Sequence, residues 1–141
     1  MKDLVAARAV FCDDARQELG HKVSLMGIYT GDMVIEGKAP VSLPKLCIAI
    51  WVNLPKDKKF KSMAVISEGP SLERKGRMEF THDELDGTAQ SDGSISYQFA
   101  AVWAQIPIIG DGPIETYIDI DGKRYFAGSV NVIFQEEATS S

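Results

Sequence analysis

Carboxylates near the start of the chain could hold a divalent cation. Asp13, Asp14 and Glu18 stand close together, and Asp32 follows in the same segment. Calcium prefers oxygen ligands of this kind, roughly six to eight per ion. The spacing matches no helix–loop–helix calcium loop, so we predict no resident metal and no cofactor. A calcium-dependent binding module, or an enzyme using Asp13, Asp14 and Glu18, is the alternative function.

A second acidic set lies near the end of the chain. Asp111, Asp119 and Asp121 surround a predicted hairpin and could also supply oxygen ligands. Aspartate is common in turns because its side chain bonds to nearby backbone groups. We therefore interpret these three residues as turn residues.

The early carboxylates alternate with basic residues, which favours a structural role. On a strand, Asp14, Arg16 and Glu18 would line one face with alternating charge. On a helix, the runner-up for this segment, Asp14 and Glu18 would repel each other one turn apart. The sequence therefore predicts a hairpin that turns at Gly20 and His21. The charge network expected to brace this hairpin consists of Asp13, Asp14, Arg16, Glu18 and Lys22.

Residues suited to nucleophilic catalysis are scarce. His21 and His82 are the two histidines, and no motif places a nucleophile beside a base. Cys12 and Cys47 lie in apolar runs, where buried free thiols are expected in a reducing compartment. We predict a protein that is not an enzyme.

Alternating apolar residues predict strands along most of the chain. The run 45–54 is apolar on both faces, which is typical of a central strand. The run 71–80 carries a charged ladder suited to a sheet edge. Asp121 and Gly122 give the strongest hairpin signal, after which Phe126 is expected to face inward. Further strands are predicted at 60–68, 95–108, 114–120 and 124–134.

These elements predict an all-β, single-domain antiparallel β-sandwich, immunoglobulin-like or C2-like, of about eight strands without a major helix. A barrel is the structural alternative. Residues 81–94 lack periodicity and are expected to form a long surface loop. The domain is assigned to residues 1–135, and residues 136–141 to a disordered tail.

Two tyrosines are the predicted contact surface. Tyr117 and Tyr125 alternate with residues expected to face inward, so they should stand exposed and close together across the last hairpin. Exposed aromatic side chains often anchor interfaces. We therefore expect a protein partner or a homo-oligomer.

The charge balance and the lengths of the apolar runs limit the classes of partner that the protein could bind. The chain of 141 residues has 15 basic and 20 acidic residues, a formal net charge of -5. Nucleic-acid binding is disfavoured because it requires a positive face. No apolar run is long enough to span a bilayer or to form a signal peptide, so we expect a cytoplasmic protein without a membrane partner.

The segment CDDARQELGHKVSLMGIYTGD, residues 12–32, resembles the motif of an uncharacterised family of bacterial and bacteriophage proteins. Its pattern is C-D-D-x-R-x-E followed by K-x-S-L-x-G-x-Y, with a later L-P-K-L run like residues 43–46. His21 departs from the Gly or Asn expected in the turn. The resemblance implies a small β-rich domain of unknown function and transfers no catalytic residue. The expected function is a non-enzymatic protein-binding or structural module.

Overall fold

The chain folds almost entirely into β-strands. The structure is a computed structural model that describes residues 5–20 and 22–136. This part of the chain contains eleven strands and one short 3-10 helix, η1 (His82–Glu84). The predicted all-β class is therefore confirmed.

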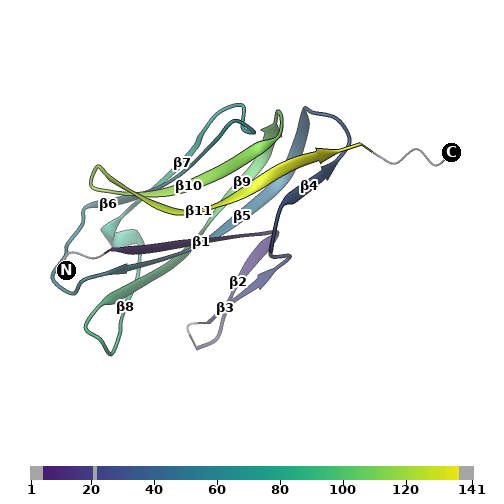
Figure 1. Cartoon of the computed structure of the whole chain (residues 1–141). Helices are drawn as coiled ribbons and strands as arrows, with labels where there is room; N and C mark the ends of the chain where they lie inside the picture. The colour runs from purple at the N-terminus through teal and green to yellow at the C-terminus, as the bar shows by residue number, and fades with distance from the viewer. Residues whose placement is uncertain (1–4, 21, 137–141) are drawn as a thin grey trace.

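The strands form two larger sheets and a separate hairpin (Figure 1). The four-stranded sheet has the order β1 (Ala6–Cys12), β5 (Val41–Leu54), β9 (Ile95–Ile108) and β8 (Gly87–Ala89). The five-stranded sheet has the order β4 (Met33–Glu36), β11 (Lys123–Gln135), β10 (Gly112–Ile120), β6 (Ser62–Glu68) and β7 (Gly76–Thr81). The hairpin pairs β2 (Asp14–Glu18) with β3 (Lys22–Met26).

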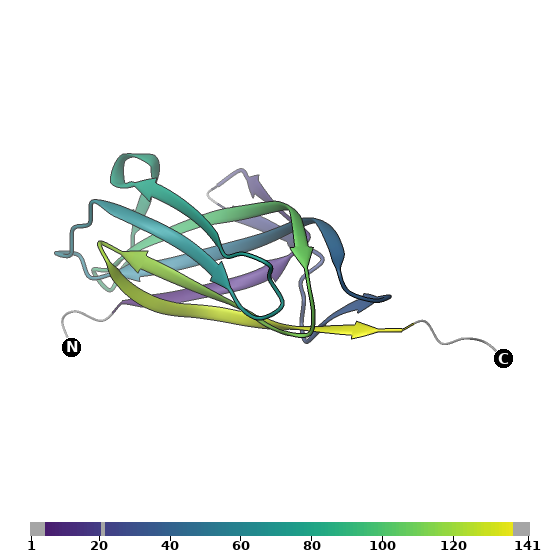
Figure 2. The same ribbon diagram turned by 90° about the horizontal axis from the view of Figure 1, so that it is seen from above.

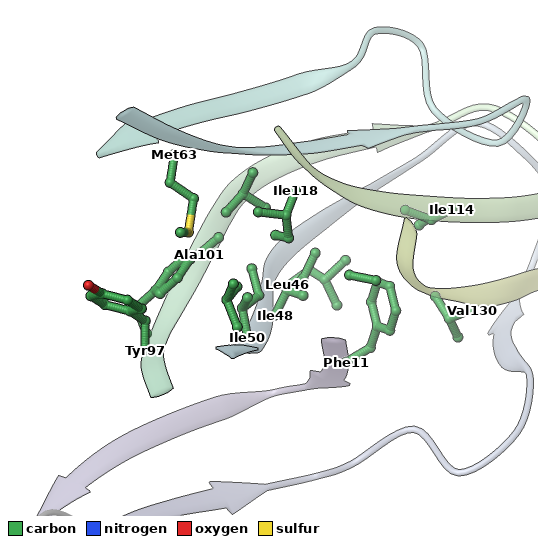
Figure 3. Packing of buried hydrophobic residues seen from close by; sticks show 14 of the residues in the cluster. Phe11, Leu46, Ile48, Ile50, Met63, Tyr97, Ala101, Ile114, Ile118 and Val130 are labelled. Carbon is green, nitrogen blue, oxygen red and sulfur yellow. The ribbon is translucent and has the colours of Figure 1, made fainter. Parts of the chain in front are cut away.

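One hydrophobic core joins the two larger sheets. Ile48 and Ile50 of β5 and Ile118 of β10 are fully buried members of the same cluster. Figure 3 shows Ile118 pointing toward the β5 side chains, with Phe11 of β1 beside them. The view from above in Figure 2 shows β11 and β10 crossing over β1 and β5. The period-two pattern therefore buries one face of each sheet.

Several predicted elements are confirmed by the strand pairing. Strand β5 lies between β1 and β9, as the apolar run required. Strand β7 forms a sheet edge with the charged Arg77 and Glu79, but it begins at Gly76, so residues 71–75 of the predicted strand lie outside it. Asp121 and Gly122 both have positive φ, 49° and 91°, and connect β10 directly to β11. The first hairpin is extended, so the helical alternative for residues 14–20 is wrong.

The strand count and the purely antiparallel pairing were predicted incorrectly. The structure has eleven strands where about eight were expected, and β4 pairs with β11 in parallel. The expected loop 81–94 contains η1 and β8, and β8 extends the four-stranded sheet beside β9. Strands β4 and β8 have only four and three residues, too few to show an apolar periodicity, and for that reason the sequence does not reveal them.

The predicted pairing of Tyr117 with Tyr125 is also wrong. Tyr117 lies opposite Phe126, whereas Tyr125 lies opposite the buried Ile118. Phe126 is 56% exposed, and Tyr125 packs against the core. A register shift in the β10–β11 ladder leaves Ala127 as an extra residue, which reverses the expected alternation. The two tyrosines therefore point to opposite faces of the sheet and cannot form one surface.

Parts of three predictions fall outside the described residues. They are residues 1–4 of the predicted domain, His21 of the first turn and residues 137–141 of the expected tail. Glu136 is described and exposed, and its carboxylate lies 3.7 Å from Nζ of Lys38.

Candidate functional site

The β2–β3 hairpin leans over the outer face of the four-stranded sheet. The amide of Asp13 donates to the carbonyl of Met26 over 2.9 Å, which closes the base of the hairpin. Nζ of Lys45 on β5 donates to the Asp14 carboxylate over 2.9 Å. Further along, Nε2 of Gln17 donates to Oε1 of Gln98 on β9 over 3.4 Å. The hairpin is therefore held to both central strands of the sheet.

The charge network differs from the predicted one. Asp14 is its centre, with Lys45 at 2.9 Å and Arg16 at 3.8 Å. Among the described residues, Glu18 and Lys22 form no ion pair within 4.0 Å, although they lie opposite each other in register. Lys45 is the partner that sequence reasoning missed, because it comes from a strand distant in sequence.

Asp13 stands apart from that network. Its carboxylate accepts a hydrogen bond from the Tyr29 hydroxyl over 3.4 Å. Burial, followed by the negative charge of Asp13, raises the pKa of Tyr29. Gly27 makes this close approach possible, because a Cβ at that position would lie 2.1 Å from an Asp13 oxygen. The structure therefore has a pair of contacts centred on Asp14 and a separate contact of Asp13, in place of the predicted five-residue network.

Acid should loosen the hairpin. The hydrogen bond from Lys45 holds the pKa of Asp14 below its usual range, with a smaller effect from the Ala15 amide. A carboxyl group whose pKa is lower in the folded state than in the unfolded state stabilises the fold at any pH above the unfolded-state pKa. That stabilisation is lost as the pH falls through the folded-state pKa. In a pH titration followed by NMR, we expect the Gln17 side-chain amide resonances to shift. The midpoint pH of this shift should lie below the usual pKa of aspartate. An Asp14→Asn variant should lack this transition, and identical titrations of both proteins would contradict the anchoring role.

The carboxylates of the metal alternative do not converge. Across residues 5–20 and 22–136, no three Asp, Glu, His or Cys side chains gather closely enough to hold an ion. In the later set, Asp111 accepts from the amide of Phe134 over 2.9 Å, and Asp119 accepts from the amide of Gly122 over 2.7 Å. Asp121 accepts from the amides of Lys61 and Ser62. These carboxylates serve as caps for backbone N–H groups, in keeping with turn residues.

The two cysteines lie opposite each other at the end of the β1–β5 ladder. Cys12 and Cys47 are free and almost completely buried beside the hairpin. Burial, followed by the proximity of Cys47, raises the pKa of Cys12 to about 12. Burial also raises the pKa of Cys47. A thiol that stays protonated at neutral pH is a poor nucleophile.

Two adjoining hollows form a trough on the outer face of the four-stranded sheet. The larger measures about 660 Å³ and the smaller about 360 Å³. Trp51, Gln90 and Ser96 line both hollows. The larger hollow is lined by residues of the β2–β3 hairpin and of the η1–β8 segment. Strands β2, β3 and β8 lie in the lower part of Figure 1. The smaller continues toward residues 6–8 of β1.

Three carboxamides and one indole are among the groups that line the trough. Gln17, Gln90 and Gln98 supply carboxamides, each able to donate and accept hydrogen bonds. Trp51 is half-buried, and the Arg8 guanidinium lies 5.2 Å from its ring centroid. At that distance the cation is attracted to the face of the ring. The lining can therefore offer both a flat apolar contact and paired donors and acceptors.

The sequence carries a weak signal for this trough. On the outer face of β5, the small Cys47 and Ala49 are covered, whereas the large Trp51 stands where the cover ends. The change from small to large residues marks the boundary of the hairpin's footprint. The presence of Gln98 and Gln90 in the lining of the trough could not be predicted, because it depends on how β8 pairs with β9.

The comparisons identify no relative from which a function could be transferred. Neither the models of known protein families nor the curated proteins give a match to this chain. No helix of the described chain is long and apolar enough to cross a membrane.

Proposed function

We propose that the protein is a non-enzymatic binding module, an immunoglobulin-like or C2-like β-sandwich, that holds an extended segment of a protein partner in its outer trough. The observation that carries this proposal is the trough itself, in which Trp51 and three carboxamides line two continuous hollows. The separation of the larger sheets supports a sandwich, since among the described strands no ladder joins one sheet to the other.

The shape and chemistry of the trough favour a polypeptide. The two hollows share Trp51, Gln90 and Ser96, so a partner chain could run from one into the other. Gln17 and Gln98 bond to each other over 3.4 Å, and each side-chain amide keeps further donor and acceptor capacity for the N–H and C=O groups of an extended backbone. Tryptophan and arginine are enriched among residues that dominate binding energy, and Trp51 and Arg8 lie together here.

The charges of the trough are mixed. Arg16 lies at one wall, and Glu84 and Asp86 lie at the other. A net charge of -5 favours a neutral or basic segment over a nucleic acid. The proposal includes no cofactor, no metal and no membrane partner. Among residues 5–20 and 22–136, no cluster of possible ligands supports the calcium alternative.

The proposed compartment is the cytoplasm. The free thiols of Cys12 and Cys47 support it, because oxidising compartments tend to convert close cysteine pairs into disulfides. A bacterial or bacteriophage origin is proposed from the motif in residues 12–32 alone.

Selection from a displayed library of unstructured peptides tests the trough. Peptides enriched on the wild-type protein should bind the Trp51→Ala variant at least about tenfold more weakly, since truncation of a central aromatic contact removes roughly 2 kcal/mol. A Gln98→Lys variant places a charge on the floor of the trough and should also weaken binding. Calorimetric affinities measure both effects.

Phe126→Ala is the matched control. Phe126 is an exposed aromatic residue on the outer face of the other sheet, so its loss should leave peptide affinity unchanged. Thermal unfolding establishes that all variants are folded. Failure to enrich any peptide, or equal losses from Phe126→Ala and Trp51→Ala, would overturn the proposal.

A further inference from the structure

A second cavity lies between the two larger sheets, away from the trough. It measures about 350 Å³, within the range of pockets that hold small ligands. Its lining comes from the start of β7 and the segment before it, the second half of β9, and the buried residues Leu46 of β5, Ser67 of β6 and Ile114 of β10. None of these residues lines the trough.

The inner part of this cavity is apolar. Leu46 and Ile114 are buried at its base, and Leu72, Ile106 and Pro107 add further apolar surface. Water bound against such walls is replaced favourably by hydrocarbon. The cavity is therefore suited to an aliphatic or aromatic group.

Trp103 forms one wall of the cavity in a fixed orientation. Its indole N–H donates to Oγ of Ser67 over 3.2 Å, and Ser67 in turn pairs with Thr116 over 3.0 Å. A Cβ at Gly76 would lie 3.3 Å from the indole ring, so glycine allows the strand to pack closely there. Because the polar atom of Trp103 is satisfied inside the protein, the ligand needs to offer the ring no hydrogen-bond acceptor.

The mouth of the cavity is basic. Arg74 and Lys75 line it and are exposed, in a chain whose net charge is -5. Among the described residues, neither side chain forms an ion pair within 4.0 Å. Two adjacent cations beside an apolar hollow are complementary to a ligand with an anionic head and a hydrocarbon body.

The backbone at the mouth is strained. Gln105 has a φ of 54°, a region that residues other than glycine seldom adopt. Its Oε1 accepts a hydrogen bond from Oγ of Ser42 over 3.4 Å. Strained positions of this kind persist where surrounding structure enforces them, and they are frequent at ligand sites.

We propose that this cavity binds a linear aliphatic monocarboxylate, with its carboxylate at Arg74 and Lys75 and its hydrocarbon chain directed toward Leu46 and Ile114. The ligand is a free small molecule, and its binding does not depend on the trough. The apolar base selects the body of the ligand, and the paired cations select the charge of its head.

Tryptophan fluorescence tests this site directly. The chain has two tryptophans, so a Trp51→Phe background leaves Trp103 as the sole tryptophan. Titration with decanoate, below the concentration at which it forms micelles, should change the emission of Trp103 to saturation. 1-Decanol, which lacks the charge, should bind roughly three- to tenfold more weakly, the range expected for exposed ion pairs.

Two double variants separate a specific site from general charge attraction. Arg74→Gln with Lys75→Gln should weaken decanoate binding roughly three- to tenfold and leave 1-decanol unaffected. Lys56→Gln with Lys59→Gln makes the same change of net charge at exposed positions outside the cavity and should alter neither affinity. No saturable change with decanoate, equal affinity for decanoate and 1-decanol, or equal effects of the two double variants would overturn the proposal.

Discussion

Replacing Gly69 by alanine is expected to lower the free energy of unfolding by about 3 kcal/mol or more. Gly69 follows β6 and has a φ of +152°, and a Cβ there would lie 2.0 Å from the carbonyl oxygen of Pro113. That oxygen belongs to the backbone of β10 and cannot move without disturbing the β6–β10 ladder. The shift of the urea unfolding midpoint measures the loss.

Gly93→Ala separates the steric clash from backbone strain. Gly93 also has a positive φ, +90°, but no atom lies within 4 Å of the position of its Cβ. The cost should therefore be limited to about 1 kcal/mol for a left-handed alanine. If the two variants lost equal stability, the close packing of β6 against β10 would be contradicted.

Replacing Ile118 by alanine should lower the free energy of unfolding by about 3–4 kcal/mol. Ile118 lies in the second half of β10, is fully buried and packs in the core shared by both sheets (Figure 3). The substitution removes buried methyl groups and leaves a cavity between rigid strands, so the loss exceeds the transfer free energy alone. Calorimetric unfolding should show a melting temperature lower by roughly 10 °C.

Ile109→Ala is the matched control for the core substitution. Ile109 is 45% exposed, and its backbone hydrogen bond to Ser71 is kept in the variant. Its replacement should cost less than about 1 kcal/mol. A loss for Ile118→Ala no larger than that of Ile109→Ala would show that Ile118 does not lie in the core.

The elements predicted correctly from the sequence are those whose signal is local. Ile114, Ile118 and Ile120 alternate with polar residues, and this pattern alone places them in the core. The turn at Asp121 and Gly122 follows from the positive φ that both positions require. Neither feature depends on residues elsewhere in the chain.

The features that sequence reasoning missed depend on distant contacts. Because Ala127 is an extra residue in β11, Tyr125 faces the core and Phe126 faces outward, the reverse of the prediction. No local sequence pattern indicates such a bulge. Strand β4 is short and gains its hydrogen bonds by parallel pairing with β11, far along the chain. Lys45 reaches Asp14 only because the hairpin leans over the sheet.

The candidate sites were predictable only in part. The motif around Asp14 correctly marked a hairpin, but the surface that this hairpin helps to form includes Trp51 and Gln98 from two other strands. Likewise, Trp103 and Arg74 meet at one cavity because the two sheets stack, a contact that periodicity does not specify. Local patterns fix which face a residue occupies, and only tertiary packing fixes which faces meet.

Intermolecular NMR contacts between the protein and an enriched peptide test the proposed binding role most directly. The account predicts nuclear Overhauser effects from peptide protons to the indole of Trp51 and to the side-chain amides of Gln98 and Gln17. Contacts to Tyr117 and Phe126 on the opposite sheet, with none to Trp51, would contradict it.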